Sequence, residues 1–157
     1  MSSHASIHEH HGADLRIGRW SEPGRAYVVT SVTRQRAAMF LNFWCARDVV
    51  LSIREVHDAG YFRCHAFVVM PDHVHLLFTL RYGLLSTVMR TFKSISARRI
   101  NARRGRRGQV WQKGCHDHAI RNASTLRASA RYIVANPLRA GLVTSLNHYP
   151  HWDTEWL

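Results

Sequence analysis

Acidic residues are scarce in this chain. Across 157 residues, 10 Asp and Glu stand against 22 Lys and Arg, which gives a formal net charge of +12 and a pI of about 11.0. Such an excess of positive charge favours a polyanionic partner, and nucleic acid is the first candidate. Nearly all of the cations are arginine, whose planar guanidinium can contact a phosphate through two hydrogen bonds. The composition therefore predicts a protein that binds nucleic acid.

Cysteines and long apolar runs are also few. The three cysteines, Cys45, Cys64 and Cys115, are odd in number and widely spaced, so they suggest a reducing compartment and no disulfide framework. We find no apolar run long enough to cross a membrane and no lysine-rich amphipathic helix. The first residues lack the apolar core of a secretory signal. We therefore expect a cytoplasmic protein without a membrane partner.

The length suits one domain with a hydrophobic core. We expect a mobile N-terminal tail over residues 1–23, in which His4, His8, His10 and His11 could bind metal adventitiously, followed by a single domain over residues 24–157.

Apolar periodicity and turn residues predict the elements of this domain. They are a strand over 26–33, a helix over 39–59 closed by Gly60, a hairpin of strands 65–69 and 74–79, a helix over 84–104, a further strand formed by 110–112 and 117–120 around Gly114, and a last helix from the N-cap Ser124 to Pro137. This order predicts an α/β protein of the α+β kind, in which helices cover a mostly antiparallel sheet.

Two histidines lie one residue apart within an apolar run that reads MPDHVHLLF over residues 70–78. Because side chains alternate faces along a strand, His73 and His75 project from the same face and form a platform for a metal ion. The alternative is that one or both histidines are only hydrogen-bonded. A second pair, His116 and His118, lies next to Cys115 and could form a zinc site, but it lacks a downstream partner at helical spacing.

Tyr132 and Asn136 are four residues apart in the predicted last helix, so they share a helical face. If that face lies over the histidine strand, Asn136 can donate a third ligand oxygen and Tyr132 can present its phenol beside the metal. The alternative is that the tyrosine packs in the core and that the Asn-Pro pair only stops the helix.

Basic residues cluster near the end of the second predicted helix, which runs into RRGRRG over residues 103–108. We predict phosphate contacts for this run, the alternative being a solvated basic terminus. The predicted DNA-binding residues are Arg34, Arg36, Lys93, Arg98, Arg99, Arg103, Arg104, Arg106 and Arg107.

Three segments occur together in the chain: MPDHVHLLF (70–78), VWQKGCHDHAIRN (110–122) and YIVANPLRAGLV (132–143). In order and spacing they resemble the REP-associated tyrosine transposases, a branch of the single-tyrosine HUH transposases. The resemblance runs from about residue 24 to 156 and includes the aromatic tail YPHWDTEW. It implies the ferredoxin-like HUH transposase fold and a location at the bacterial nucleoid. The role of His118, which falls on a histidine common in the family motif, is left open.

The resemblance also implies the chemistry. His73, His75 and Asn136 would hold a divalent ion, Mg²⁺ or Mn²⁺, and Tyr132 would attack a DNA phosphate to give a 5′-phosphotyrosine. The implied substrate is single-stranded DNA next to a hairpin, as in DNA transposition or repeat processing. A phenol of ordinary pKa near 10 is a poor nucleophile until a metal or base assists it, and a metal-bound phosphate meets that need.

Two other functions compete with this one. A metallohydrolase could use the same histidine pair, although barrel hydrolases need about 250 residues. The other is a catalytically inert, domesticated DNA-binding protein, against which the retained histidines, tyrosine and asparagine argue. The sequence leaves open the target DNA, the metal identity and whether the protein is a monomer or a homodimer.

Overall fold

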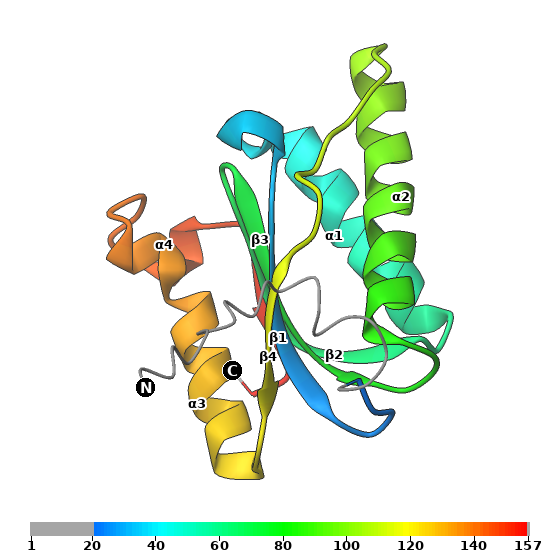
Figure 1. Cartoon of the computed structure of the whole chain (residues 1–157). Coiled ribbons are helices and arrows are strands. Elements are labelled where there is room, and N and C mark those ends of the chain that lie inside the picture. The colour runs from blue at the N-terminus through cyan, green and yellow to red at the C-terminus, as the bar shows by residue number, and fades with distance from the viewer. Residues whose placement is uncertain (1–20, 157) are drawn as a thin grey trace, which may run out of the picture.

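The computed structural model describes residues 21–156, and the central feature is a five-stranded antiparallel sheet with strand order β4-β1-β3-β2-β5 (Figure 1). The strands are β1 (Ala26–Val32), β2 (Phe62–Met70), β3 (His73–Leu80), β4 (His116–Ile120) and β5 (Trp152–Thr154). The histidines of the predicted tail lie outside the described residues, so that prediction is not tested. The predicted mostly antiparallel α+β fold is confirmed.

Helices cover both faces of the sheet (Figure 1). On one face lie α1 (Phe43–Asp58) and α2 (Leu85–Arg104), and on the other lie α3 (Ala123–Val134) and α4 (Asn136–Arg139). Three short 3₁₀ turns complete the described elements: η2 (Arg34–Arg36), η3 (Met39–Leu41) and η4 (Leu146–His148). No helix in this part of the chain is long and apolar enough to cross a membrane.

The two faces of β3 have different partners because its side chains alternate. Val74, Leu76 and Phe78 are fully buried in the core beneath α1 and α2. Leu77 belongs to the smaller core that α3 covers with Ile133 and its neighbours. The histidines of β3 share the parity of Leu77, so the predicted metal platform faces α3 and α4.

The first helix is shorter than predicted. It begins at Phe43, because the side-chain oxygen of Asn42 accepts the backbone N–H groups of Trp44 and Cys45 as an N-cap. The preceding residues form η3 and not helix α1. The predicted C-terminal signal is confirmed: Gly60 follows α1 in the left-handed region, with φ +85°.

The prediction of a strand over residues 110–112 is wrong. Trp111 makes only an isolated bridge with Thr33, and β4 begins at His116. The hydrophobic residues Val110 and Trp111 are buried between α2 and the sheet. They are apolar because they pack in the core, and not because they belong to a continuous strand.

The last helix also differs from the prediction. Its N-cap is Asn122, whose side chain accepts the N–H of Thr125, and the predicted cap Ser124 lies inside the helix. The break falls before Asn136 and not at Pro137, because a proline fits the first turn of the next helix, α4.

Candidate metal and tyrosine site

His73 and His75 begin strand β3 directly after the turn that joins it to β2. Their ring centroids are 4.8 Å apart and the rings are nearly perpendicular, at 80°. Both side chains are partly exposed on the face of α3 and α4. The predicted same-face pair is therefore present in the folded protein.

One nitrogen of each ring is already held by a neighbour. The Nδ1 of His73 lies 2.6 Å from a carboxylate oxygen of Asp72, and the Nδ1 of His75 lies 2.7 Å from the hydroxyl of Thr30. Within residues 21–156, no hydrogen bond engages either Nε2. Ligand histidines commonly use one nitrogen for such a supporting contact and the other for the metal.

Burial and neighbouring charges shift the pKa values of His75 and of Asp72, the carboxylate beside His73. Burial lowers the pKa of His75 to about 4, and the charges of His73 and Arg139 act in the same direction. His75 is therefore neutral at physiological pH and keeps a lone pair for a metal. Burial opposes ionisation of Asp72, but the hydrogen bonds and charges of His73 and Arg36 prevail and lower the pKa of its carboxyl.

Tyr132 lies on α3 with 66% of its surface exposed, so its hydroxyl is accessible to a ligand. The guanidinium carbon of Arg139, in α4, is 3.7 Å from the centroid of the tyrosine ring. Arg139 also acts on the pKa of His75. Arg139 therefore packs on the tyrosine and acts electrostatically on His75, although no hydrogen bond or ring contact within the described part of the chain joins Tyr132 directly to either histidine.

Asn136 is the first residue of α4 and is half-buried. Its side-chain nitrogen donates to the carbonyl of Ile133 at 2.9 Å, which orients the amide and leaves the side-chain oxygen as the remaining acceptor. Within residues 21–156, no hydrogen bond joins the Asn136 side chain to either histidine. Over residues 21–156, no group of three His, Cys, Asp or Glu side chains could hold a metal.

The second histidine pair lies on the edge strand β4. His116 is opposite Thr30, which is itself opposite His75, so the two pairs share one face of the sheet. Both His116 and His118 are exposed. The zinc site considered for them with Cys115 finds no support among the described residues.

Several predicted DNA-binding cations have partners inside the protein. Arg36 pairs with Asp72 at 3.3 Å, and Arg99 pairs with Glu55 at 2.7 Å. The ammonium group of Lys93 donates to the carbonyls of Gln112 and Gly114, which ties the loop before β4 to α2.

Arg103 is also paired within the protein. Its guanidinium bonds the buried carboxylate of Asp48 at 2.6 and 3.1 Å. The remaining predicted cations are exposed and have no ion pair within residues 21–156: Arg34, Arg98, Arg104, Arg106 and Arg107.

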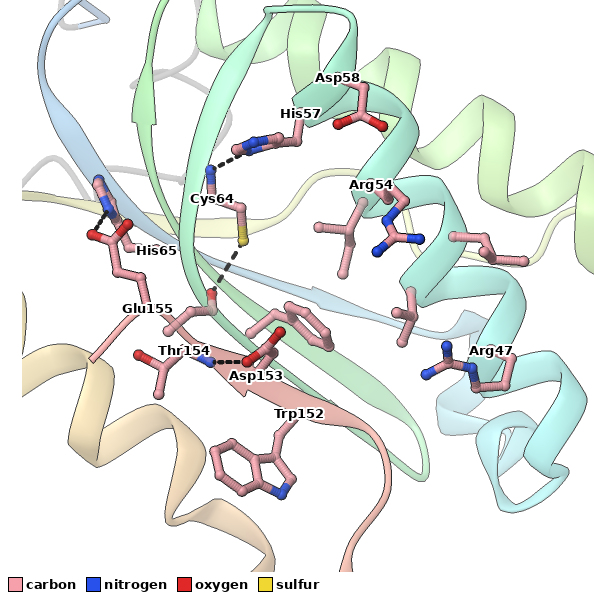
Figure 2. Close-up of a pocket in the computed structure, with 15 residues that line it drawn as sticks. Arg47, Arg54, His57, Asp58, Cys64, His65, Trp152, Asp153, Thr154 and Glu155 are labelled. Atoms are coloured by element: carbon pink, nitrogen blue, oxygen red, sulfur yellow. Dashed lines mark hydrogen bonds and ion pairs between the residues drawn. The ribbon is translucent and has the colours of Figure 1, made fainter. Parts of the chain in front are cut away.

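A groove elsewhere on the molecule lies between α1 and strands β2 and β5 (Figure 2). It has a volume of about 470 Å³ and includes Cys64 and His57, a residue pair that could suggest a thiol enzyme. However, His57 accepts the backbone N–H of Cys64, and the thiol faces the carbonyl of Ala66. Burial raises the pKa of Cys64 to about 12, so this thiol is not a nucleophile.

Three residues of the site were missed by sequence reasoning. Asp72 and Thr30 hold the histidines, and Arg139 covers the tyrosine. Asp72 precedes His73 directly, and Arg139 follows Tyr132 by seven residues, close to two helical turns, so both had a local signal. Thr30 had none, because its position opposite His75 depends on strand pairing.

Comparisons with known proteins identify the family of this chain. The family model described as "Transposase IS200 like" matches residues 24–136. The REP-associated tyrosine transposase of Escherichia coli K12 is 31% identical over 136 residues, 84% of this chain and 78% of the relative. A Haemophilus influenzae protein is 24% identical over 139 residues, 82% of this chain and 78% of the relative.

A solved structure is similar as well. The structure of a REP-associated tyrosine transposase bound to a REP hairpin superposes with a TM-score of 0.70 at 27% identity, covering 85% of this chain and 79% of that chain. The predicted family, fold and transposase class of function are therefore confirmed, whereas the metal and the roles of the site residues remain predictions. The chain belongs to the IS200-like transposases and, within them, to the REP-associated tyrosine transposases.

Proposed function

We propose that this protein cuts and rejoins single-stranded DNA beside a hairpin, with Tyr132 as the nucleophile. The observation that carries the proposal is the exposed phenol of Tyr132 beneath Arg139, whose charge also acts on His75. The solved relative supports the substrate class, since it is bound to a REP hairpin. The net charge of +12 suits a DNA substrate.

The chemistry exchanges one phosphodiester for another. The Tyr132 oxygen attacks the phosphorus and loses its proton to solvent, while the 3′ oxygen of the DNA leaves and takes up a proton. The 5′ end of the DNA is then esterified to the tyrosine. Because the bond energy is retained, a 3′ hydroxyl can reverse the step and join strands without ATP.

The donor set fits a divalent ion. The two Nε2 atoms of His73 and His75 and the side-chain oxygen of Asn136 would hold it, and the amide oxygen and phosphate substrate favour Mg²⁺ or Mn²⁺. When bound, such an ion neutralises charge on the scissile phosphate. Asp72 and Thr30 orient the imidazoles before any ligand arrives.

Arg139 has two roles in this proposal. Its guanidinium packs on the ring of Tyr132 and so restricts where the hydroxyl points. Its positive charge also acts on His75 and would favour a phosphate bound near the histidines. Arg139 is thus a positioning residue for the nucleophile.

The proposal is tested by comparing the cleavage of one DNA sequence in three different forms. The protein, with Mg²⁺ or Mn²⁺, is offered one sequence as a hairpin with an unpaired flank, as an unstructured strand and as a full duplex. We expect nicking in the flank of the hairpin, with protein attached to the 5′ end, and no cutting of duplex, because stacked duplex resists the bending that in-line attack requires. Binding without any covalent product would indicate an inert DNA-binding protein, and equal cutting of all three forms would contradict the hairpin substrate.

A further inference from the structure

The start of α1 exposes two aromatic side chains that do not belong to the proposed catalytic site. Trp44 is 60% exposed and Phe43 is 46% exposed, and their rings meet edge to face with centroids 5.1 Å apart. Leu41, just before them, is exposed too. Large apolar side chains gathered on a surface generally mark a binding site.

Arginines surround this aromatic pair. The guanidinium carbon of Arg103 lies 5.7 Å from the Trp44 ring centroid. The buried carboxylate of Asp48 holds the Nε and Nη2 of Arg103, so Nη1 is left to contact a phosphate. Arg104 acts electrostatically on Cys45, the residue next to Trp44, and its own side chain is exposed.

A third arginine lies on the other side of the pair. The Phe43 ring packs on His151 with centroids 5.1 Å apart. Burial, together with the nearby charge of Arg47, lowers the pKa of His151. Figure 2 shows Arg47 projecting from α1 toward the groove beside β5. The aromatic surface is therefore flanked by positive charge on both sides.

This surface is at the same end of the sheet as the histidine pair. The backbone N–H of Phe40 donates to the carbonyl of Pro71, in the turn just before His73. On the other side, the carbonyl of His151 accepts the N–H of Val69, in the strand that pairs with β3. Figure 1 shows the start of α1 and the end of α2 on one side of the sheet in the upper part of the view, and α4 on the other side. The segment that leads into α1 therefore contacts the β2–β3 turn from which the histidine strand begins, with α1 and the histidines on opposite faces of the sheet.

We propose that Phe43 and Trp44 form a stacking platform for an unpaired nucleobase of the DNA flank, with Arg47, Arg103 and Arg104 contacting the adjacent phosphates. The proposal rests on the proposed function for its substrate, and it adds a second binding surface outside the catalytic site. Aromatic faces interleaved with cations are the usual means of holding single strands without regard to sequence. A second copy of this chain is a poorer occupant, because two copies of a protein with net charge +12 would bring their arginines together.

The test is equilibrium binding of the full chain, in EDTA, to a fluorescent hairpin with an unpaired flank. Loss of one base stack should lower affinity by roughly ten-fold in Trp44→Ala, while Trp44→Tyr keeps most of it. The salt dependence of binding should not change in Trp44→Ala, because stacking displaces no counterions, whereas Arg104→Gln should reduce it. The matched control is Tyr82→Ala, which removes a 70% exposed aromatic side chain next to the beginning of α2, at the other end of that helix.

An abasic scan of the flank locates the stacked base. One abasic position should weaken binding of the wild-type protein as much as Trp44→Ala does, and the two changes together should cost little more than either alone. Equal affinity of wild type and Trp44→Ala, with cleavage intact, would overturn the platform and leave the proposed function standing. A wild-type protein that binds no flanked hairpin would overturn both. A shift from dimer to monomer in Trp44→Ala, without loss of DNA affinity, would assign the surface to a second copy and overturn the proposal.

Discussion

Arg139 covers the ring of Tyr132, with its guanidinium carbon 3.7 Å from the ring centroid. The two residues come from α4 and α3, which are separated only by Ala135, and they lie seven residues apart along the chain. Because the charge of Arg139 also lowers the pKa of His75, this contact ties the proposed nucleophile to the proposed metal ligands. The first two predictions follow from it.

Tyr132→Phe should abolish cleavage and the covalent DNA adduct and leave DNA affinity nearly intact. Only a hydroxyl is lost, and the phenyl ring can still pack beneath Arg139. A denaturing gel with end-labelled DNA measures both products, and binding is measured separately by anisotropy. Cleavage by the Phe variant at the wild-type rate would show that another residue is the nucleophile.

Arg139→Gln should slow single-turnover cleavage by roughly 10- to 100-fold, because the tyrosine loses the group that orients it and a nearby positive charge. Affinity for DNA should change much less than the rate. Arg131→Gln is the matched control, since Arg131 is an exposed arginine one residue before Tyr132 and has no ion pair among the described residues. Equal effects of the two substitutions would mean that only net charge matters.

His73→Ala or His75→Ala should abolish metal-dependent cleavage, and Asn136→Ala should weaken it less, because one neutral oxygen donor is lost and not an imidazole. Thr30→Val should lower affinity for Mn²⁺ by about 10-fold, since it removes the hydroxyl that orients His75. Calorimetric titration with Mn²⁺ tests binding without reference to cleavage. Activity that persists in EDTA would rule out the metal site.

Neutralising Arg104, Arg106 and Arg107 together should lower DNA affinity and flatten its salt dependence, by about 0.7 log units for each single-strand phosphate that the variant no longer binds. Arg99→Gln should change the slope less, because Arg99 is paired with Glu55. The measurement is a salt titration of binding for each variant. A slope unchanged in the triple variant would show that this run is a solvated terminus.

Arg103 has to be tested separately, because its role is partly structural. Replacing it with Ala leaves the carboxylate of Asp48 buried without its partner, so the urea midpoint of unfolding should fall. The double variant with Asp48→Asn should recover part of that stability.

Acid should weaken the attachment of the C-terminal segment through Glu155. Burial opposes its ionisation, but hydrogen bonds and charges from His65 and Arg63 outweigh burial and lower the pKa of Glu155. A carboxyl with a lowered folded-state pKa stabilises the protein above its unfolded-state pKa, about 4.3, and this contribution is lost as pH falls through the folded-state value. Urea unfolding between neutral and acidic pH should therefore depend less on pH in Glu155→Gln. The same pH dependence in both proteins would contradict this role.

The sequence by itself determined the features that depend on near neighbours. The period of two along a strand placed His73 and His75 on one face, and apolar spacing located α2 to within one residue at its start. The arginine-rich composition indicated nucleic acid before any fold was known. The family was recognised from three ordered segments, since their spacing reflects one fold and one site.

Only the tertiary structure decided which side chains these groups contact. Thr30 lies opposite His75 because β1 and β3 pair in one register, and Asp48 meets Arg103 because α1 packs on α2. The same packing separates arginines that are held inside the protein from those exposed to a ligand, a distinction that composition does not contain. Trp44 lies in the first turn of α1 because the Asn42 cap begins the helix there, and its side chain is exposed. These relationships depend on contacts between residues far apart in the chain or on the exact helix ends, and local sequence patterns specify neither.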